Sequence, residues 1–204
     1  MKHLVAITVF AGMMISSGDA ELLTFDLINK NGTSWDGLSA GVYTNAATGL
    51  SLEASLYAYL NGAYSAGSQL NSTAAEFGIN ASGSGDETAL FDTNNGQEAL
   101  WVSFDRMVRI KSITVASFTA GNVETGAWQV ADGPMVNFTS SGTYDVDALL
   151  NPGAYFKVIA INEGGGNGWS LNSFTVEALP EPATALMLGF GGLTAAVIRR
   201  ATRV

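Results

Sequence analysis

The central part of the sequence predicts an all-β domain, an antiparallel β-sandwich with a jelly-roll-like arrangement. In residues 21–178, apolar and polar residues alternate with a period of two rather than with a helical period. Clusters of glycine, asparagine and serine separate the alternating runs. Roughly eight or nine short strands in about 160 residues are typical of two packed sheets. The chain of 204 residues therefore fits a single domain of this class.

The clearest strand runs from Leu50 to Leu60. Its leucines and alanines share one face, while Tyr57 and Tyr59 lie on the opposite, outward face. Asn61 and Gly62 follow directly and predict a tight turn. The other predicted strands are 22–28, 99–104, 108–118, 127–130, 135–138, 143–149, 155–161 and 173–178.

Two stretches depart from this simple pattern. The apolar phase of the predicted strand 108–118 changes between Ile110 and Ile113, so we expect a β-bulge near Ser112. Residues 61–98 have the weakest pattern, and 73–77 is expected to form one helical turn.

The first 20 residues have the three parts of a secretory signal peptide. Lys2 precedes a run of 12 mostly apolar residues, and small or polar residues follow. Twelve residues span ~18 Å as a helix, which is too short for a hydrocarbon core of ~30 Å. Gly18, Asp19 and Ala20 fit a cleavage site, so we expect the mature chain to begin at Glu21. A buried helix of the fold is the alternative.

The C-terminus combines a proline motif, an apolar segment and a basic tail. Pro180, Glu181 and Pro182 form a stiff, extended strip of the shape that a protease cleft can bind. The uncharged segment 183–198 reaches ~24 Å as a helix, and we expect it to cross a thinned membrane. The tail, 199–204, is expected to stay cytoplasmic. Its basic residues are Arg199, Arg200 and Arg203.

These three parts, in this order, resemble the PEP-CTERM sorting signal of exopolysaccharide-producing Gram-negative bacteria. The resemblance covers residues 179–204. It implies recognition by an exosortase, a membrane-embedded cysteine protease that cuts near the motif. It also implies a transient inner-membrane anchor, followed by display at the cell surface or release outside the cell. A plain single-pass anchor is the alternative, whereas Leu179 to Ala183 does not match a Gram-positive sortase signal.

Charge and composition exclude several functions. Residues 21–178 contain five basic and 16 acidic residues, a net charge of −11, which argues against nucleic-acid binding. A chain cleaved after Ala20 has no histidine or cysteine, so it cannot build a Ser-His-Asp triad, a Cys-His pair or a typical zinc site. Carboxylate pairs, such as Asp145 and Asp147, are the remaining route to glycoside hydrolysis. Solvated surface acids are the simpler explanation of these residues, and we expect no enzymatic activity.

Two binding hypotheses concern the domain itself. Asp86, Glu87 and Asp92 lie in one region rich in glycine and asparagine, where they would supply oxygen ligands for a structural calcium ion. An ordinary acidic loop is the alternative, and no other cofactor is expected. Tyr57, Tyr59 and Trp169 would form an aromatic platform for a glycan.

The alternative to the platform is that Trp101 and Trp169 fill the core while the tyrosines pair across strands. From the sequence we therefore expect a non-enzymatic, exported surface or extracellular-matrix protein. Its expected partners are an exosortase, the membrane before processing, and exopolysaccharide or the cell-surface matrix. A carbohydrate-binding module on the same scaffold is the second hypothesis, and a glycoside-active enzyme is the third.

Overall fold

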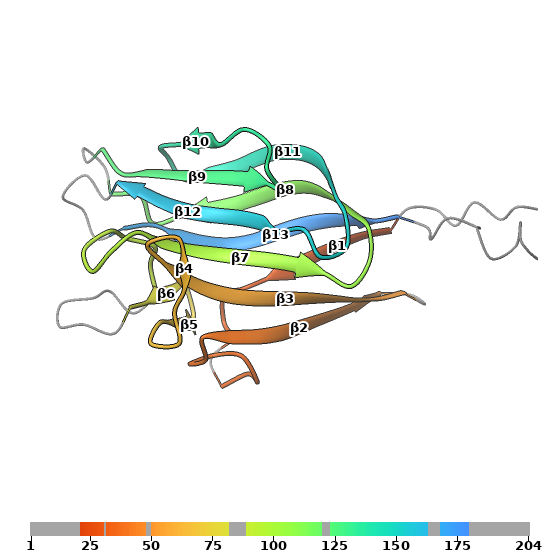
Figure 1. Cartoon of the computed structure of the whole chain (residues 1–204), viewed down its shortest axis with the longest axis horizontal. Coiled ribbons are helices and arrows are strands. Elements are labelled where there is room, and N and C mark those ends of the chain that lie inside the picture. Colours follow the sequence, from red (N-terminus) through yellow and green to blue (C-terminus); the bar gives the residue numbers. More distant parts are fainter. Residues whose placement is uncertain are drawn as a thin grey trace, which may run out of the picture.

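The computed structural model describes residues 21–30, 32–47, 50–81, 89–119, 123–162 and 168–179. These residues form two antiparallel β-sheets that face each other, with a separate two-stranded hairpin beside them (Figure 1). The expected β-sandwich is confirmed at this level. The expected signal peptide and the sorting signal from Pro180 onward lie outside the described residues. Within the described ranges there is no helix that could span a membrane.

The smaller sheet has four strands. Their order is β1 (Glu21–Asp26), β13 (Ser170–Ala178), β8 (Val108–Ala116) and β11 (Gly142–Leu150). Strand β1 is the first predicted segment after the expected cleavage site, and it pairs along its whole length with β13, near the end of the described chain. The two ends of the domain therefore lie side by side in one sheet.

The larger sheet has seven strands. Their order is β10 (Val136–Phe138), β9 (Thr125–Val130), β12 (Phe156–Asn162), β7 (Glu98–Phe104), β3 (Leu50–Leu60) and β2 (Ala40–Ala47), while β4 (Ala63–Tyr64) pairs with β3 off this path. The separate hairpin consists of β5 (Gln69–Ser72) and β6 (Phe77–Asn80).

The predicted alternation decides which face of each strand is buried. Along β3, Leu52, Ala54, Leu56 and Ala58 are fully buried, and the residues between them are exposed or partly exposed. The turn after β3 is also confirmed: Asn61 and Gly62 both have positive φ (53° and 75°), as the tight hairpin to β4 requires.

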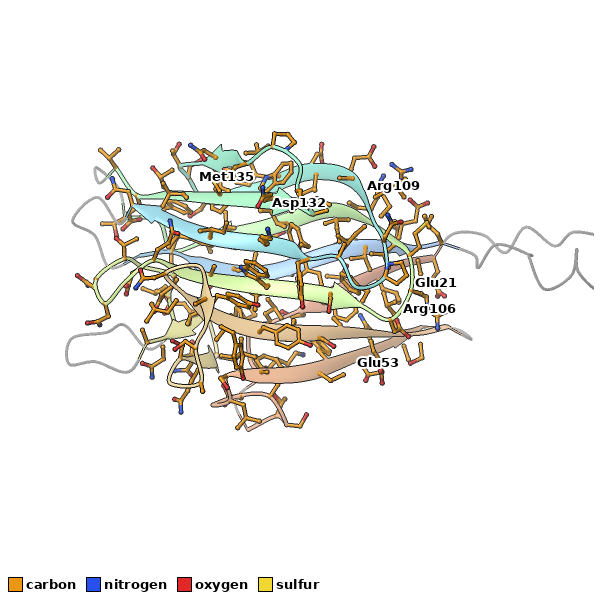
Figure 2. All side chains as sticks on the ribbon, in the orientation of Figure 1. Glu21, Glu53, Arg106, Arg109, Asp132 and Met135 are labelled. Carbon is orange, nitrogen blue, oxygen red and sulfur yellow. The ribbon has the colours of Figure 1, made fainter. Side chains whose placement is uncertain are left out.

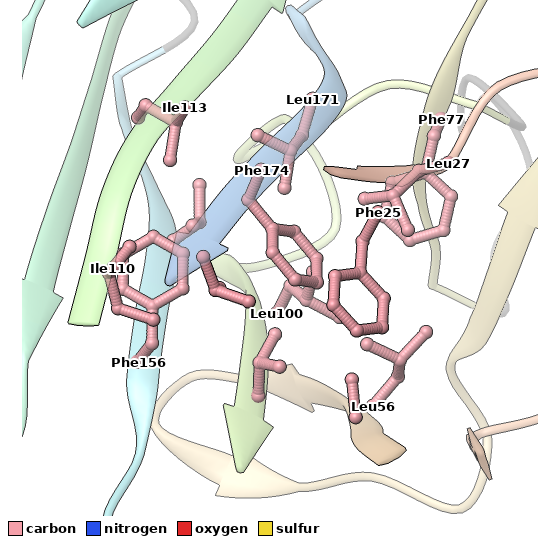
Figure 3. Packing of buried hydrophobic residues seen from close by; sticks show 14 of the residues in the cluster. Phe25, Leu27, Leu56, Phe77, Leu100, Ile110, Ile113, Phe156, Leu171 and Phe174 are labelled. Atoms are coloured by element: carbon pink, nitrogen blue, oxygen red, sulfur yellow. The ribbon is translucent and has the colours of Figure 1, made fainter. Parts of the chain in front are cut away.

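Aromatic side chains from both sheets meet in the core (Figure 3). Phe25 of β1 stacks on Phe174 of β13 with ring centroids 4.9 Å apart, and Phe104 of β7 approaches Phe25 edge-on at 5.8 Å. Burial of each such ring contributes about 1.5–3 kcal/mol, and the contact between Phe25 and Phe104 joins the two sheets.

A glycine permits the closest packing at one end of the core. A Cβ atom on Gly126 of β9 would lie 2.2 Å from the Phe138 ring and 2.7 Å from the Trp169 ring. Both rings are buried, and they pack edge to face with centroids 4.9 Å apart. The absence of a side chain at Gly126 therefore lets the two rings rest against the backbone.

The expected bulge is confirmed, and the expected helical turn is wrong. In β8, Ser112 and Ile110 pair with the consecutive residues Thr175 and Val176, so β8 carries one extra residue at this point. Residues 73–77 instead connect β5 and β6: the Thr73 amide donates to the Glu76 carbonyl at 2.8 Å. Thr73 Oγ1 also accepts a hydrogen bond from the Glu76 amide at 3.0 Å, which makes this a side-chain-stabilised turn.

Candidate functional site

Five aromatic side chains gather on the outer face of the larger sheet. We call this group the aromatic face; its members are Tyr57, Tyr59, Tyr64, Trp101 and Tyr155. All five are at least partly exposed, and Tyr64 is 49% exposed. The core lies on the opposite face of the same strands, so hydrophobic burial inside the sandwich does not explain their position.

Strand register brings these residues together. Tyr57 of β3 lies opposite Trp101 of β7, which lies opposite Lys157 of β12, which in turn lies opposite Gln129 of β9. Because neighbouring strands are about 4.8 Å apart, this row places aromatic and polar side chains side by side across four strands. The row is built from segments that are far apart in the sequence.

Trp101 is the centre of the aromatic face. Tyr59 stacks on it with ring centroids 4.0 Å apart and an interplanar angle of 5°. The Lys157 ammonium lies over the Trp101 ring, 4.5 Å from its centroid. Since β7 lies between β3 and β12, Tyr59 and Lys157 approach Trp101 from opposite sides. Trp101 therefore holds its two neighbours in place rather than offering an open ring to a ligand.

The remaining rings form the rim of the aromatic face. Tyr57 lies between Tyr64 and Tyr155 in edge-to-face contacts, with centroids 6.4 and 6.1 Å away. The Tyr64 hydroxyl and Ser39 Oγ are hydrogen-bonded at 2.9 Å, which fixes the ring that is most exposed to solvent. Tyr64 thus offers the largest apolar surface to a ligand, and the hydrogen bond to Ser39 holds its ring in one orientation.

Polar side chains accompany the rings. Ser55 and Ser103 lie directly opposite each other on the outer face, in the row next to Tyr57 and Trp101. On the other side, Gln129 donates from Nε2 to the Gly133 carbonyl at 2.8 Å and accepts from Lys157 at 3.2 Å. The aromatic face is therefore flanked by hydroxyl, amide and ammonium groups that can bond to sugar hydroxyls.

The clustering of phenols changes the acidity of one of them. Partial burial raises the pKa of Tyr59 above its usual value near 10, and the neighbouring phenols Tyr155, Tyr57 and Tyr64 raise it further. A negative charge on Tyr59 is thus disfavoured.

The structure places two of the three expected platform residues on the outer face and the third in the core. Tyr57 and Tyr59 lie on the outer face as expected. The expectation for Trp169 is wrong, because its indole is fully buried and stacks on Phe91 with centroids 4.7 Å apart. Trp101, by contrast, lies on the aromatic face and does not fill the core.

The sequence carried signals that would have located the missed residues. Ser103 lies two residues from Trp101 along β7, so the two side chains share a face, and the polar serine marks that face as the outer one. Lys157 marks the phase of Tyr155 in the same way. Tyr64 follows the Asn61-Gly62 turn at a spacing that returns it beside Tyr59, its register partner.

The calcium hypothesis gains little from the described residues. Asp86 and Glu87 lie outside them. Asp92 is buried, and its Oδ1 accepts from the Asn94 amide at 2.9 Å. The neighbouring buried Glu98 accepts from the amides of Ala81 and Asp92 at 3.2 and 3.0 Å. No group of three or more acidic or imidazole side chains in the described part of the chain is arranged to hold a metal ion.

The proposed carboxylate pair also has structural partners. Asp147 forms a salt bridge with Lys111, and Arg109 lies 3.8 Å from the same carboxylate oxygen. The Lys111 ammonium, through its hydrogen bond and its charge, lowers the pKa of the Asp147 carboxyl, and Arg109 lowers it further. A lowered pKa is the opposite of what a general acid requires at neutral pH.

Comparisons with known proteins add one distant similarity. No protein-family model and no curated protein matches the chain. Among solved structures, the chain is similar to the crystal structure of Podospora anserina GH26-CBM35 β-(1,4)-mannanase, with 19% sequence identity and a TM-score of 0.31. The match covers 62% of this chain and 28% of the mannanase chain. A similarity of this size supports no functional conclusion.

Proposed function

We propose that this domain is a non-catalytic carbohydrate-binding β-sandwich and that the aromatic face is its binding surface. The observation that carries this proposal is the gathering of five aromatic rings on the solvent side of a sheet whose other side forms the core. Exposed aromatic groups that are rimmed by polar side chains are typical of interaction surfaces rather than of a purely structural sheet.

A sugar suits this surface because it has both apolar and polar sides. The C–H groups of a pyranose would pack on the exposed Tyr64 ring, while its hydroxyls would bond to the polar side chains beside the rings. Trp101 would support the surface by fixing Tyr59. The broad, strand-built face suits an extended polysaccharide chain better than a single small sugar.

Binding of the full chain to a glycan array tests the proposal. The variant Tyr64→Ala is expected to bind about two- to tenfold more weakly, since it loses one aromatic contact of ~0.5–1.5 kcal/mol. Tyr64→Phe keeps the ring and is expected to bind nearly as well as the natural chain. Leu22→Ala removes an exposed apolar side chain from the smaller sheet and serves as the control. If the natural chain binds no glycan, the proposal is wrong.

We include export in the proposal, because the sequence predicts targeting signals at both ends. A signal peptide of residues 1–20 would direct export, and the C-terminal signal would hold the chain in the inner membrane until an exosortase acts on Pro180–Pro182. The processed protein would then act at the cell surface or in the extracellular matrix, beside polysaccharides. The proposal also includes that the strands of the β-sandwich are connected in a jelly-roll-like order.

Processing has its own test, independent of glycan binding. Replacing both Pro180 and Pro182 by alanine should leave unprocessed chain in the membrane fraction, because the extended strip becomes flexible. The mass of the extracellular protein reports both ends at once. Material outside the cell that retains Val204 would contradict exosortase processing, and the glycan-binding proposal would still stand.

A structural matrix protein without a glycan ligand is the second candidate. The observation that favours it is the cross-strand packing within the aromatic face, where rings contact one another and thereby stabilise the sheet. The array separates the two candidates, because only the carbohydrate-binding protein retains a glycan.

A further inference from the structure

The positive charge of Lys157 stands out within an acidic domain. Residues 21–178 contain five basic residues, of which three form ion pairs with carboxylates: Arg106, Arg109 and Lys111. Lys157 forms no ion pair with any residue that the structure describes. Lys30, the fifth, lies near Tyr43, away from the aromatic face. The aromatic face therefore carries a lysine that forms no salt bridge within the described ranges.

The side chains that neighbour Lys157 on the outer face of the strands are uncharged, and Asp132, in the turn whose Gly133 carbonyl holds Gln129, forms no salt bridge with Lys157. Trp101 and Gln129 lie opposite it on the two neighbouring strands. Tyr155 and Ile159 precede and follow it on the same face of the chain.

The acidic residue on the outer face of β3 is distant. Glu53 is four residues from Tyr57, about 13 Å along the strand. Figure 2 shows Glu53 toward the same end of the sheets as Glu21 and Arg106. At this separation, salt at physiological concentration screens most of its interaction with Lys157.

The ammonium of Lys157 is also held in position. It donates to Gln129 Oε1 at 3.2 Å, and Gln129 is itself fixed by its bond to the Gly133 carbonyl. An ammonium has three donors, so further donors remain available beyond the bond to Gln129. A positioned cation beside exposed rings favours a ligand that combines an apolar ring with a carboxylate.

We infer that the aromatic face binds acidic polysaccharides, with the carboxylate of a uronic acid pairing with Lys157. This inference rests on the proposed carbohydrate-binding function and specifies its ligand class. A uronic acid presents a C–H face for stacking and a carboxylate at the edge of the same ring. The net negative charge of the domain would otherwise repel such a polymer, so local attraction at Lys157 decides whether it binds.

Two polymers with the same backbone provide the test. Polygalacturonate carries a carboxylate on each sugar, and its methyl ester carries none. The full chain is expected to bind polygalacturonate more tightly than the ester, and added salt should weaken only the binding of the acid form. This comparison uses the natural protein and needs no variant to fold.

A matched pair of variants locates the effect. Lys157→Gln removes the charge at the aromatic face, and Lys111→Gln removes the same charge from the outer face of the smaller sheet. We expect Lys157→Gln to bind polygalacturonate about fivefold more weakly and Lys111→Gln to bind it unchanged. Circular dichroism verifies that both variants are folded.

The possible outcomes separate the inference from the function on which it rests. Equal binding of the acid and the ester, or equal losses in both lysine variants, would overturn the inference and leave carbohydrate binding intact. If the chain binds neither polymer but binds a neutral glycan, the inference is wrong and carbohydrate binding still stands. A chain that binds no glycan at all overturns both.

Discussion

The stack of Tyr59 on Trp101 is expected to couple β3 to β7 energetically. The two rings stack with centroids 4.0 Å apart and nearly parallel planes, and aromatic pairs contribute about 0.5–1.5 kcal/mol beyond their area burial. Trp101→Ala also removes the contact with Lys157, at about 0.5–1 kcal/mol for an exposed site. Trp101→Ala should therefore lower the free energy of unfolding by more than Tyr59→Ala does.

A double-mutant cycle isolates the stack from these other losses. Urea unfolding of the natural protein, Tyr59→Ala, Trp101→Ala and the double variant, followed by far-ultraviolet circular dichroism, gives the four free energies. The double variant should lose about 0.5–1.5 kcal/mol less than the two single losses combined, because both remove the same contact. This free energy corresponds to a change of about two- to tenfold in the equilibrium constant for folding, at 1.36 kcal/mol per factor of ten.

A control cycle sets the threshold for refuting this reasoning. Leu149 is an exposed side chain on β11 of the other sheet. Tyr59→Ala and Leu149→Ala should therefore be additive to within about 0.3–0.5 kcal/mol. If the Tyr59 and Trp101 losses are also additive within that range, the stack contributes no coupling, and Trp101 does not organise the aromatic face as described.

Three further predictions concern packing and titration. Gly126→Ala should lower the free energy of unfolding by about 1–3 kcal/mol in a urea titration, because the new Cβ meets the buried Phe138 ring at 2.2 Å; unchanged stability would show that the ring moves freely. Asp147 has a lowered pKa, so its pairing with Lys111 stabilises the fold at pH values above the usual carboxyl pKa. This contribution disappears as the pH falls through the lowered pKa. Asp147→Asn should flatten the acid side of a pH–stability curve; the same curve for both proteins would contradict this. Tyr59 has a raised pKa, so its contribution to stability is lost as pH rises above the usual phenol range, and a phenolate absorbance titration of Tyr59→Phe should lack one phase above that range.

Local sequence patterns determined the strands and several of their details. The alternation in β3 placed Tyr57 and Tyr59 on the outer face, since side chains along a strand point to opposite sides. Asn61-Gly62 specified a tight turn, because both positions need a positive φ that these residues tolerate. The change of phase in β8 indicated its bulge in the same local way.

Other strands were missed because their patterns are weak. Strand β2 consists largely of small residues, and its place follows from an eight-residue pairing with β3. The strands of hairpin β5–β6 contain Ser72 at a buried position and the glycine Gly78, so their apolar alternation is incomplete.

The two tryptophans show what only the tertiary structure decided. Along β7, Ser103 marks the phase of Trp101 as the outer one, but only the pairing with β3 and β12 brought Trp101 beside Tyr57 and Lys157. Trp169 is buried because Phe91 and Phe138, from distant parts of the chain, pack against it. A period of two separates the faces of a strand, but long-range pairing decides which face meets the core and which residues become neighbours on the other.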